Sequence, residues 1–351
     1  MDNKNIIGTD ELILITGSNG FIGSRVVETF LCHGYTNLRC FTRPSSNLSR
    51  LNSIISAYPS AKIDVINGNL LSVKDSSRAA AGASIICHLA AGIEKTFPGS
   101  FLNSVVTTKN LLEAVARSKC IKRFVNISSF AVYSNIHAKR NSLFDETCAL
   151  EDNFTARNEA YVYAKAKQDD IVVEYSKKQN IPYVILRPGA VYGPGKTQLT
   201  ARVGIDTFGF FLHLGGSNRI PLTYVDNCAE AIVLAGITKG VDGEVFNIVD
   251  DNLPTSRAFL SMYKKNAKRF GHVYLPYPLF YIFCFFWEKY SQWSEGQLPA
   301  VFNPRRCSAY WKKHRYSNKK LKDMLGWKPI VTFEEGAKRF FEYVRQTEVQ
   351  K

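Results

Sequence analysis

Short apolar runs alternate with longer segments of helical periodicity through the first half of the chain. Residues 11–16 form an apolar run that ends at a glycine, which is typical of a buried strand, and 21–33 carries apolar residues at helical spacing. Strands that alternate with helices in this way predict a parallel sheet with helices on both faces. Further strands are expected at 38–43, 62–67, 84–91, 121–129 and 183–188, and helices at 47–57, 100–118 and 157–179.

The pattern loosens after Pro188, where glycine and proline crowd residues 189–196. We expect helices near 255–270 and 332–347 to lie in a smaller lobe, and a strand at 244–249 to return to the main sheet. The sequence therefore predicts an α/β protein with a Rossmann doubly wound parallel sheet. Its NAD(P)-binding domain is expected at 1–188, and 189–351 is expected to form mainly a C-terminal substrate-binding lobe.

The most apolar segment of the chain is 275–290, LPYPLFYIFCFFWEKY. Its uninterrupted apolar part is about a dozen residues long, whereas a membrane-spanning helix needs about 20. Core packing, an oligomer contact, a helix on a membrane surface and a wall for an apolar substrate all fit it. The sequence leaves a peripheral membrane contact open.

Charge and cysteine content narrow the class of protein. The formal net charge is +15, but the basic residues are spread along the chain, so we expect a solvated basic surface and no specific nucleic-acid partner. The N-terminus lacks the basic start and long apolar stretch of a signal peptide, which predicts a cytoplasmic protein. The eight cysteines are scattered without a C-x-x-C pair, so neither a disulfide framework nor a metal site is expected.

A glycine loop, Gly17-Ser-Asn-Gly20-Phe-Ile-Gly23, joins the first expected strand to the first expected helix. Gly17 permits a sharp turn, Gly20 lets backbone amides approach a pyrophosphate, and Gly23 lets the helix pack closely on the strand. Since the strand, the loop and the helix follow in the required order, the motif predicts a dinucleotide site.

The second expected strand indicates which dinucleotide is bound. A site for NAD normally offers an acidic residue about 20 residues after the loop, yet no Asp or Glu occurs between Glu28 and Asp64. Arg43 stands there instead, and a guanidinium can pair with a 2′-phosphate. We therefore favour NADP over NAD, with a plain surface role for Arg43 as the alternative.

A tyrosine and a lysine, Tyr161 and Lys165, are spaced so that both lie on one face of the helix expected at 157–179. A phenol is a weak base at neutral pH, but a nearby ammonium favours the phenolate. Tyr161 can then exchange the alcohol proton while hydride moves to or from a nicotinamide ring, and Lys165 can also hold the nicotinamide ribose.

Two serines, Ser128 and Ser129, end the strand that precedes this helix, at the edge where ligands bind in open parallel sheets. A hydroxyl there can hold a substrate oxygen near Tyr161. By position we predict Ser129 as the catalytic serine and Ser128 as a substrate contact. Tyr163 is expected to point elsewhere.

These segments together resemble the extended short-chain dehydrogenase/reductase superfamily. The resemblance rests on TGSNGFIG, HLAA (88–91), ISSFAVYS (127–134), Tyr161 with Lys165, LRPGAVYGPG (186–195), LTYVDNCAEAI (222–232) and LGWKP (325–329). It implies a Rossmann fold, a nicotinamide cofactor, catalytic Ser129, Tyr161 and Lys165, and a homodimer. The expected cofactor contacts are Gly17, Asn19, Gly20, Phe21, Ile22, Gly23, Arg43, Asn69, Leu70, Ala90, Ala91 and Lys165.

The superfamily includes nucleotide-sugar epimerases and dehydratases as well as 3β-hydroxysteroid-dehydrogenase-like oxidoreductases. Nucleotide-sugar enzymes typically carry Asn where this chain has Ala190, which favours the steroid-dehydrogenase-like branch. Arg305 and Arg306 favour the other branch, because sugar-nucleotide relatives place a diphosphate-binding arginine in this region. Phe130-Ala131 after Ser129 departs from the acidic pair usual in 4,6-dehydratases.

We therefore predict an NAD(P)-dependent oxidoreductase that acts on a secondary alcohol or ketone of a small molecule. A nucleotide-sugar 4-epimerase with tightly bound NAD is the alternative, since the same catalytic residues serve both reactions. A non-enzymatic dinucleotide sensor would not require Ser129, Tyr161 and Lys165 together.

Overall fold

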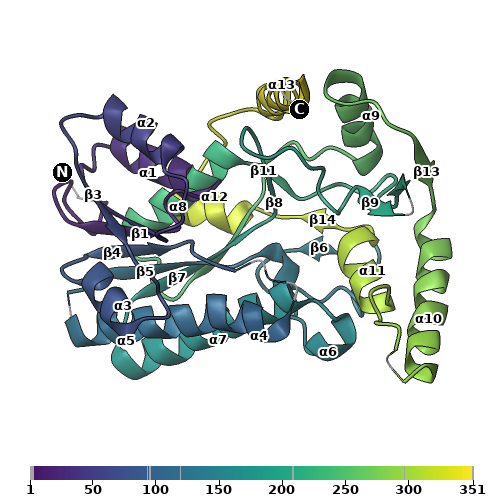
Figure 1. The fold of residues 1–351 in the computed structure, drawn as a ribbon, viewed down its shortest axis with the longest axis horizontal. Helices are drawn as coiled ribbons and strands as arrows, with labels where there is room; N and C mark the ends of the chain where they lie inside the picture. The colour runs from purple at the N-terminus through teal and green to yellow at the C-terminus, as the bar shows by residue number, and fades with distance from the viewer. Residues whose placement is uncertain are drawn as a thin grey trace.

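A seven-stranded parallel sheet forms the centre of the protein (Figure 1). The computed structural model describes residues 4–349 apart from positions 93, 95, 119, 208 and 296. The strand order is β12-β7-β5-β4-β1-β2-β3, so β1 has β2 on one side and β4 on the other. The strands are β1 (Ile13–Thr16), β2 (Asn37–Thr42), β3 (Lys62–Asn67), β4 (Ile85–His88), β5 (Arg123–Ile127), β7 (Tyr183–Pro188) and β12 (Val245–Ile248).

Helices cover both faces of this sheet, as Figure 1 shows. Each face has its own apolar core because the strands alternate their side chains between the two faces. One face is covered by α1 (Gly23–Cys32), α2 (Ser49–Ala57), α8 (Val225–Ile237) and α12 (Lys319–Leu325), and the other by α3 (Val73–Ala80), α5 (Thr107–Ser118) and α7 (Ala160–Gln179).

The segments after Pro188 contribute to both parts of the molecule. β12 pairs with β7 in the central sheet, and α8 packs against α1. The remaining segments build a second apolar core beside the sheet. Its strands are β8 (Ala190–Tyr192) with β11 (Leu222–Tyr224), and β9 (Gly204–Thr207) with β10 (Phe210–His213) and β13 (His272–Tyr274), while β6 (Leu143–Phe144) pairs with β14 (Arg315–Tyr316).

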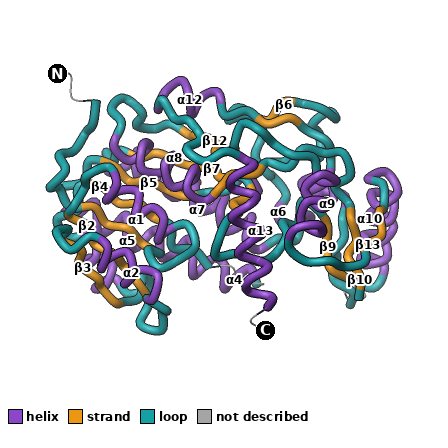
Figure 2. Tube along the Cα trace, turned by 90° about the horizontal axis from the view of Figure 1, so that it is seen from above, coloured by secondary structure: helices purple, strands orange, loops and turns teal. Residues whose placement is uncertain are grey.

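Four helices complete this second part. Helix α10 lies at the end of the molecule farthest from β2 and β3, beside β13 and β10 (Figure 2). It packs inward through Phe280 and Cys284 against Trp311, and much of its surface is exposed. The four helices are α9 (Ser256–Asn266), α10 (Tyr277–Trp293), α11 (Pro304–Trp311) and α13 (Phe333–Val349).

The predicted fold class is confirmed, but several helix boundaries differ. Helix α3 was not expected, because VKDSSRAA contains few apolar residues and is buried through small ones, Ser76 and the two alanines at its end. The helix expected at 100–118 starts earlier, as α4 (Phe97–Ser100), and runs as a π-helix over Phe101–Val106 before α5. The helix expected from 157 is broken at Asn158, which has a left-handed backbone (φ +54°) between α6 (Phe154–Arg157) and α7.

Candidate active site

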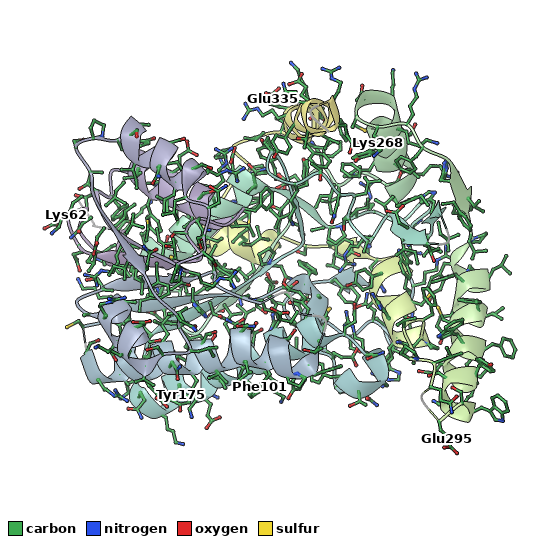
Figure 3. All side chains as sticks on the ribbon, viewed as in Figure 1. Lys62, Phe101, Tyr175, Lys268, Glu295 and Glu335 are labelled. Carbon is green, nitrogen blue, oxygen red and sulfur yellow. The ribbon has the colours of Figure 1, made fainter. Side chains whose placement is uncertain are left out.

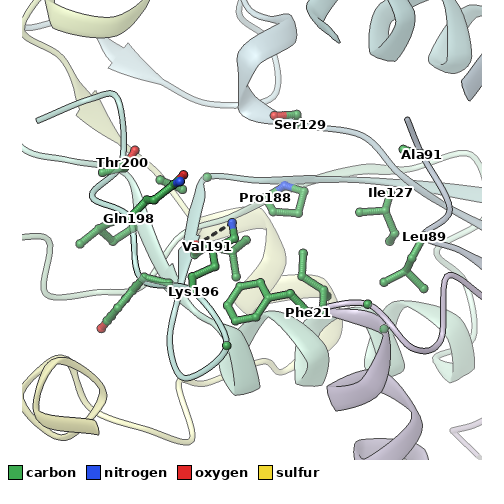
Figure 4. Close-up of a pocket in the computed structure, with 18 of the residues that line it drawn as sticks. Phe21, Leu89, Ala91, Ile127, Ser129, Pro188, Val191, Lys196, Gln198 and Thr200 are labelled. Carbon is green, nitrogen blue, oxygen red and sulfur yellow. Dashed lines mark hydrogen bonds between the residues drawn. The ribbon is translucent and has the colours of Figure 1, made fainter. Parts of the chain in front are cut away.

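The carboxyl ends of four parallel strands open into one cavity of about 670 Å³. The glycine loop follows β1, and the cavity lies where the chain direction from strand to strand reverses, between β1 and β4. In Figure 4 Phe21 and Lys196 border one side of the cavity and Ser129 the opposite side. The strand ends that line it are Gly17 after β1, Leu89 and Ala91 after β4, Ile127, Ser128 and Ser129 at β5, and Pro188 and Gly189 at β7.

The glycine loop leaves no room for side chains at its turns. Gly17 has a left-handed backbone (φ +68°), and a Cβ on Gly23 would lie 2.0 Å from the carbonyl oxygen of Gly17. Helix α1 therefore begins directly against the end of β1, and Gly20, Phe21, Ile22 and Gly23 line the cavity at this point. This cradle suits the diphosphate of a dinucleotide, because backbone N–H groups at a helix N-terminus bind anions.

Tyr161 and Lys165 both line the cavity from α7, and Ser129 lines it from the end of β5. Tyr161 is hydrogen-bonded to Ser129, whose Oγ also accepts the amide of Ala131 at 3.1 Å. The ammonium of Lys165 donates to the carbonyl oxygen of Ile127 at 2.6 Å and to Oε1 of Gln168 at 2.8 Å. The three residues predicted as catalytic are thus together in one cavity.

The titration of this pair differs from the expectation. Burial raises the pKa of Tyr161, and the Ser129 hydrogen bond opposes this only in part. Burial also lowers the pKa of Lys165 to about 8, although Asp169 opposes the shift. The predicted lowering of the Tyr161 pKa by the ammonium is not found, because desolvation disfavours the phenolate and Lys165 is engaged by Ile127 and Gln168.

Beneath the cavity, Asp169 of α7 holds the end of β5. Its carboxylate accepts hydrogen bonds from Asn126 at 2.9 Å, from Ser128 at 2.7 Å and from Arg187 at 3.3 Å. Arg187 lies over the ring of Tyr133 at 5.0 Å and donates to the hydroxyl of Tyr133. The hydroxyl of Ser128 is therefore turned to Asp169, while Ser129 faces Tyr161.

Some predicted ligand-binding residues lie away from the lining of this cavity. Arg43 follows β2 and is exposed. The side-chain oxygen of Asn69 accepts a hydrogen bond from the amide of Leu71 within a turn. Arg305 pairs with Glu151 and Asp152 at 2.5 and 2.8 Å, and Arg306 pairs with Glu159 at 3.4 Å. The predicted residues outside the lining are Asn19, Arg43, Asn69, Leu70, Ala90, Arg305 and Arg306.

Two cations near the cavity were missed from the sequence. Lys196 lines the cavity from the loop after β8. Arg50, on the first turn of α2, reaches that loop, because its guanidinium nitrogens lie 2.7 and 2.9 Å from the Cβ that Gly195 lacks. The only signal for Lys196 was its place directly after the GPG turn in the predicted glycine- and proline-rich stretch.

The fold and the glycine loop define a Rossmann dinucleotide-binding protein, and the sequence identifies its family. The NAD dependent epimerase/dehydratase family matches residues 13–249. The chain belongs to this family, which confirms the resemblance to the extended short-chain dehydrogenases/reductases. It is an enzyme of the NAD-dependent oxidoreductase and epimerase type.

Curated relatives match along nearly the whole chain. Sterol-4-alpha-carboxylate 3-dehydrogenase, decarboxylating, from Candida albicans is 27% identical over 95% of this chain and 97% of its own length. The mouse protein of that name is 24% identical, over 93% and 88%. The 3-beta-hydroxysteroid dehydrogenase from Mycolicibacterium neoaurum is 25% identical, over 94% and 90%.

Solved structures share the fold. UDP-glucuronic acid 4-epimerase from Bacillus cereus, in complex with NAD, has a TM-score of 0.71 at 22% identity, over 96% of this chain and 99% of that one. dTDP-glucose 4,6-dehydratase from Bacillus anthracis, also with NAD, has a TM-score of 0.69 at 21% identity, over 97% and 98%. At this identity the likeness establishes the fold alone.

Three further features of the described residues bear on possible sites: the state of the cysteines, the grouping of metal-binding side chains, and the length and apolar character of the helices. All eight cysteines are free. Within residues 4–349, leaving out the five undescribed positions, no three His, Cys, Asp or Glu side chains are placed to hold a metal. Among the helices of those same residues, α10 included, none combines the length and the apolar character that crossing a bilayer requires.

Proposed function

We propose that this protein is an NAD(P)-dependent dehydrogenase that oxidises or reduces a secondary alcohol or ketone with Ser129, Tyr161 and Lys165. The observation that carries the proposal is the single cavity that these three residues share with the glycine loop. The residues Gly17–Gly23 would hold a nicotinamide cofactor, which would supply hydride transfer to or from the substrate carbon.

The chain's own residues handle the proton. Ser129 and Tyr161 hold the substrate oxygen, and the phenol is the group that gives or takes its proton. A phenol whose pKa is raised by burial keeps its proton, which suits donation to a carbonyl oxygen during reduction. Lys165 lies one helical turn away, and in this proposal it holds the cofactor ribose.

The substrate in this proposal is a sterol or steroid with a 3β-hydroxyl group. Three relatives with near-complete coverage carry sterol or hydroxysteroid dehydrogenase names. The substrate end of the cavity is lined by Leu199, Leu222, Phe259 and Phe340, which suits an apolar ring system. The arginines that favoured a sugar diphosphate are instead paired with Glu151, Asp152 and Glu159.

NADP is the proposed cofactor. The end of β2 carries Thr42 and Arg43 and no carboxylate that would bind an adenosine ribose. Arg50 lies on the first turn of α2, beside the loop that borders the glycine cradle, and has no ion pair within the described part of the chain. Arg43 and Arg50 together offer two guanidinium groups to a 2′-phosphate.

The proposal is tested by turnover. Purified protein is given NADP or NAD with a panel of 3β-hydroxysteroids, with and without a 4-carboxyl group, and the reduced cofactor is followed at its absorbance band. Tyr161→Phe is expected to lower kcat by at least about 100-fold, since general acid–base catalysis contributes this much.

Tyr163→Phe is the matched control, because Tyr163 lies on the same helix but packs against Phe97, Phe101 and Phe154. It is expected to leave kcat within about twofold of the wild type. Equal activity of the Tyr161→Phe and wild-type proteins would refute the proposed role. Epimerisation of a UDP-sugar with retained NAD and no net cofactor turnover would support the 4-epimerase alternative instead.

The proposed setting is the cytoplasmic surface of a membrane. Helix α10 exposes a ridge of large apolar residues, with Phe286 64% and Trp293 77% exposed (Figure 3 shows its side chains projecting outward). Trp and Tyr prefer the membrane–water interface, and the net charge of +15 complements anionic lipid. The ridge consists of Leu279, Ile282, Phe283, Phe285, Phe286, Tyr290 and Trp293. A homodimer, which the family resemblance implies, is part of the proposal.

A further inference from the structure

Lys196 extends into the cavity from the loop that follows β8. Its ammonium lies 4.9 Å from the centre of the Phe21 ring and donates one hydrogen bond, to the carbonyl oxygen of Val191 at 3.3 Å (Figure 4). Phe21 is the residue between Gly20 and Ile22 of the glycine loop. Lys196 therefore lies on the side of the cavity that the glycine cradle forms.

The ammonium of Lys196 has fewer polar partners than the ammonium of Lys165, the other lysine of the cavity. Lys165 donates two short hydrogen bonds, whereas Lys196 donates one long hydrogen bond and lies over the face of the Phe21 ring. In the described ranges Lys196 forms no ion pair with a carboxylate. Desolvation lowers the pKa of Lys196. The side chain of Lys196 is exposed where it lines the cavity, so its ammonium is available to pair with an anion bound there.

The loop that carries Lys196 is held against the cradle. Gly195 has a backbone that side chains rarely adopt (φ +112°), and a Cβ there would lie 3.1 Å from the Phe21 ring and within 3 Å of Arg50. The close approach of the loop to Phe21 and Arg50 thus depends on glycine. It fixes the backbone of Lys196 so that the side chain faces the cavity.

We propose that Lys196 pairs with an anionic oxygen group of a ligand bound in this cavity. The inference rests on the proposed function for the existence of that ligand. A cofactor diphosphate and a substrate carboxylate both supply this chemistry, and contact with Phe21 favours the diphosphate. Lys196 would then add a charged donor beside the backbone amides of the glycine cradle.

The first test measures binding of cofactor fragments without substrate. Isothermal titration compares ADP-ribose, which has the diphosphate, with adenosine, which lacks it, in wild-type, Lys196→Gln and Lys178→Gln proteins. Lys178 is an exposed lysine at the end of α7 and serves as the matched control. We expect Lys196→Gln to weaken ADP-ribose binding about tenfold or more and to leave adenosine binding unchanged, since charge-assisted hydrogen bonds are the strong ones.

The second arm tests a substrate carboxylate. If ADP-ribose binding is unchanged, a KM that rises about tenfold for a 4-carboxylated sterol, but not for the same sterol without the carboxyl group, assigns Lys196 to the substrate. No change in either arm, with unfolding midpoints equal to the wild type, overturns the inference. If the wild-type protein binds neither ADP-ribose nor NADP, the proposed function itself fails, whatever the variants do.

Discussion

Replacing Asp169 should destabilise the protein far more than replacing its neighbour Asp170. Asp169 is 3% exposed and accepts hydrogen bonds from Asn126, Ser128 and Arg187. Asp170 is on the exposed side of the same helix and pairs only with Lys167, at 2.9 Å. The two positions share helix propensity and chemistry, so they differ mainly in burial and in partners.

The size of the destabilisation follows from the charge of Arg187, which stays buried when Asp169 is replaced. Asp169→Ala leaves the guanidinium of Arg187 buried without its carboxylate, which costs about 3–5 kcal/mol of unfolding free energy. Asp170→Ala removes an exposed ion pair, which contributes no more than about 1 kcal/mol.

Urea unfolding followed by far-ultraviolet circular dichroism measures the difference. With a slope of about 3 kcal/mol per molar urea, the midpoint should fall by about 1 M or more for Asp169→Ala. The change for Asp170→Ala should be near the error of the measurement. The double variant Asp169→Ala/Arg187→Met should recover part of the loss, because no uncompensated charge is left.

Equal midpoints for the Asp169→Ala and Asp170→Ala proteins would refute this reasoning, since they would mean that the buried pair contributes nothing. A double variant that is no more stable than the Asp169→Ala protein would show that the unpaired guanidinium of Arg187 does not cause the loss of unfolding free energy.

Three further predictions concern the glycine cradle, the catalytic lysine and the membrane ridge. Gly23→Ala should lower the unfolding free energy by about 1–3 kcal/mol and weaken NADP binding in titration, because the added Cβ would collide with the Gly17 carbonyl. Gly271→Ala is the control and should change neither quantity, since no atom lies within 4 Å of the added Cβ. The pH profile of kcat/KM for reduction of the ketone should fall as pH rises through about 8, where the ammonium of Lys165 loses its proton; a flat profile to pH 10 would contradict the assignment. Phe286→Ser with Trp293→Ser should reduce sedimentation with anionic vesicles at an unchanged urea midpoint, and undiminished sedimentation would remove the membrane role.

The part of the fold that depends on local pattern could be predicted from the sequence. The apolar run at 11–16 became β1, and the helical periodicity of 21–33 became α1, because both elements bury residues at regular spacing. The glycine loop and Ser129 could be placed at one edge because parallel strands share their carboxyl ends. Helix α3 was not predicted from the sequence because its buried residues are small.

Contacts between distant segments could not be predicted. Arg305 looked available for a ligand, yet it pairs with Glu151, which is 154 positions earlier in the chain. The raised pKa of Tyr161 depends on its burial, which no spacing reveals. Lys196 became a candidate only once its loop was seen against Phe21.

The pairing of β12 with β7 has a consequence for the synthesis of this protein. When residues 1–188 have left the ribosome, β7 still has one unpaired edge, and the sheet face that α8 will cover is bare. The face stays bare until α8, which ends at Ile237, has emerged, and the edge stays open until β12, which ends at Ile248, has emerged. The nascent chain therefore exposes an aggregation-prone strand edge over this interval, and a fragment that stops at Pro188 should aggregate rather than fold.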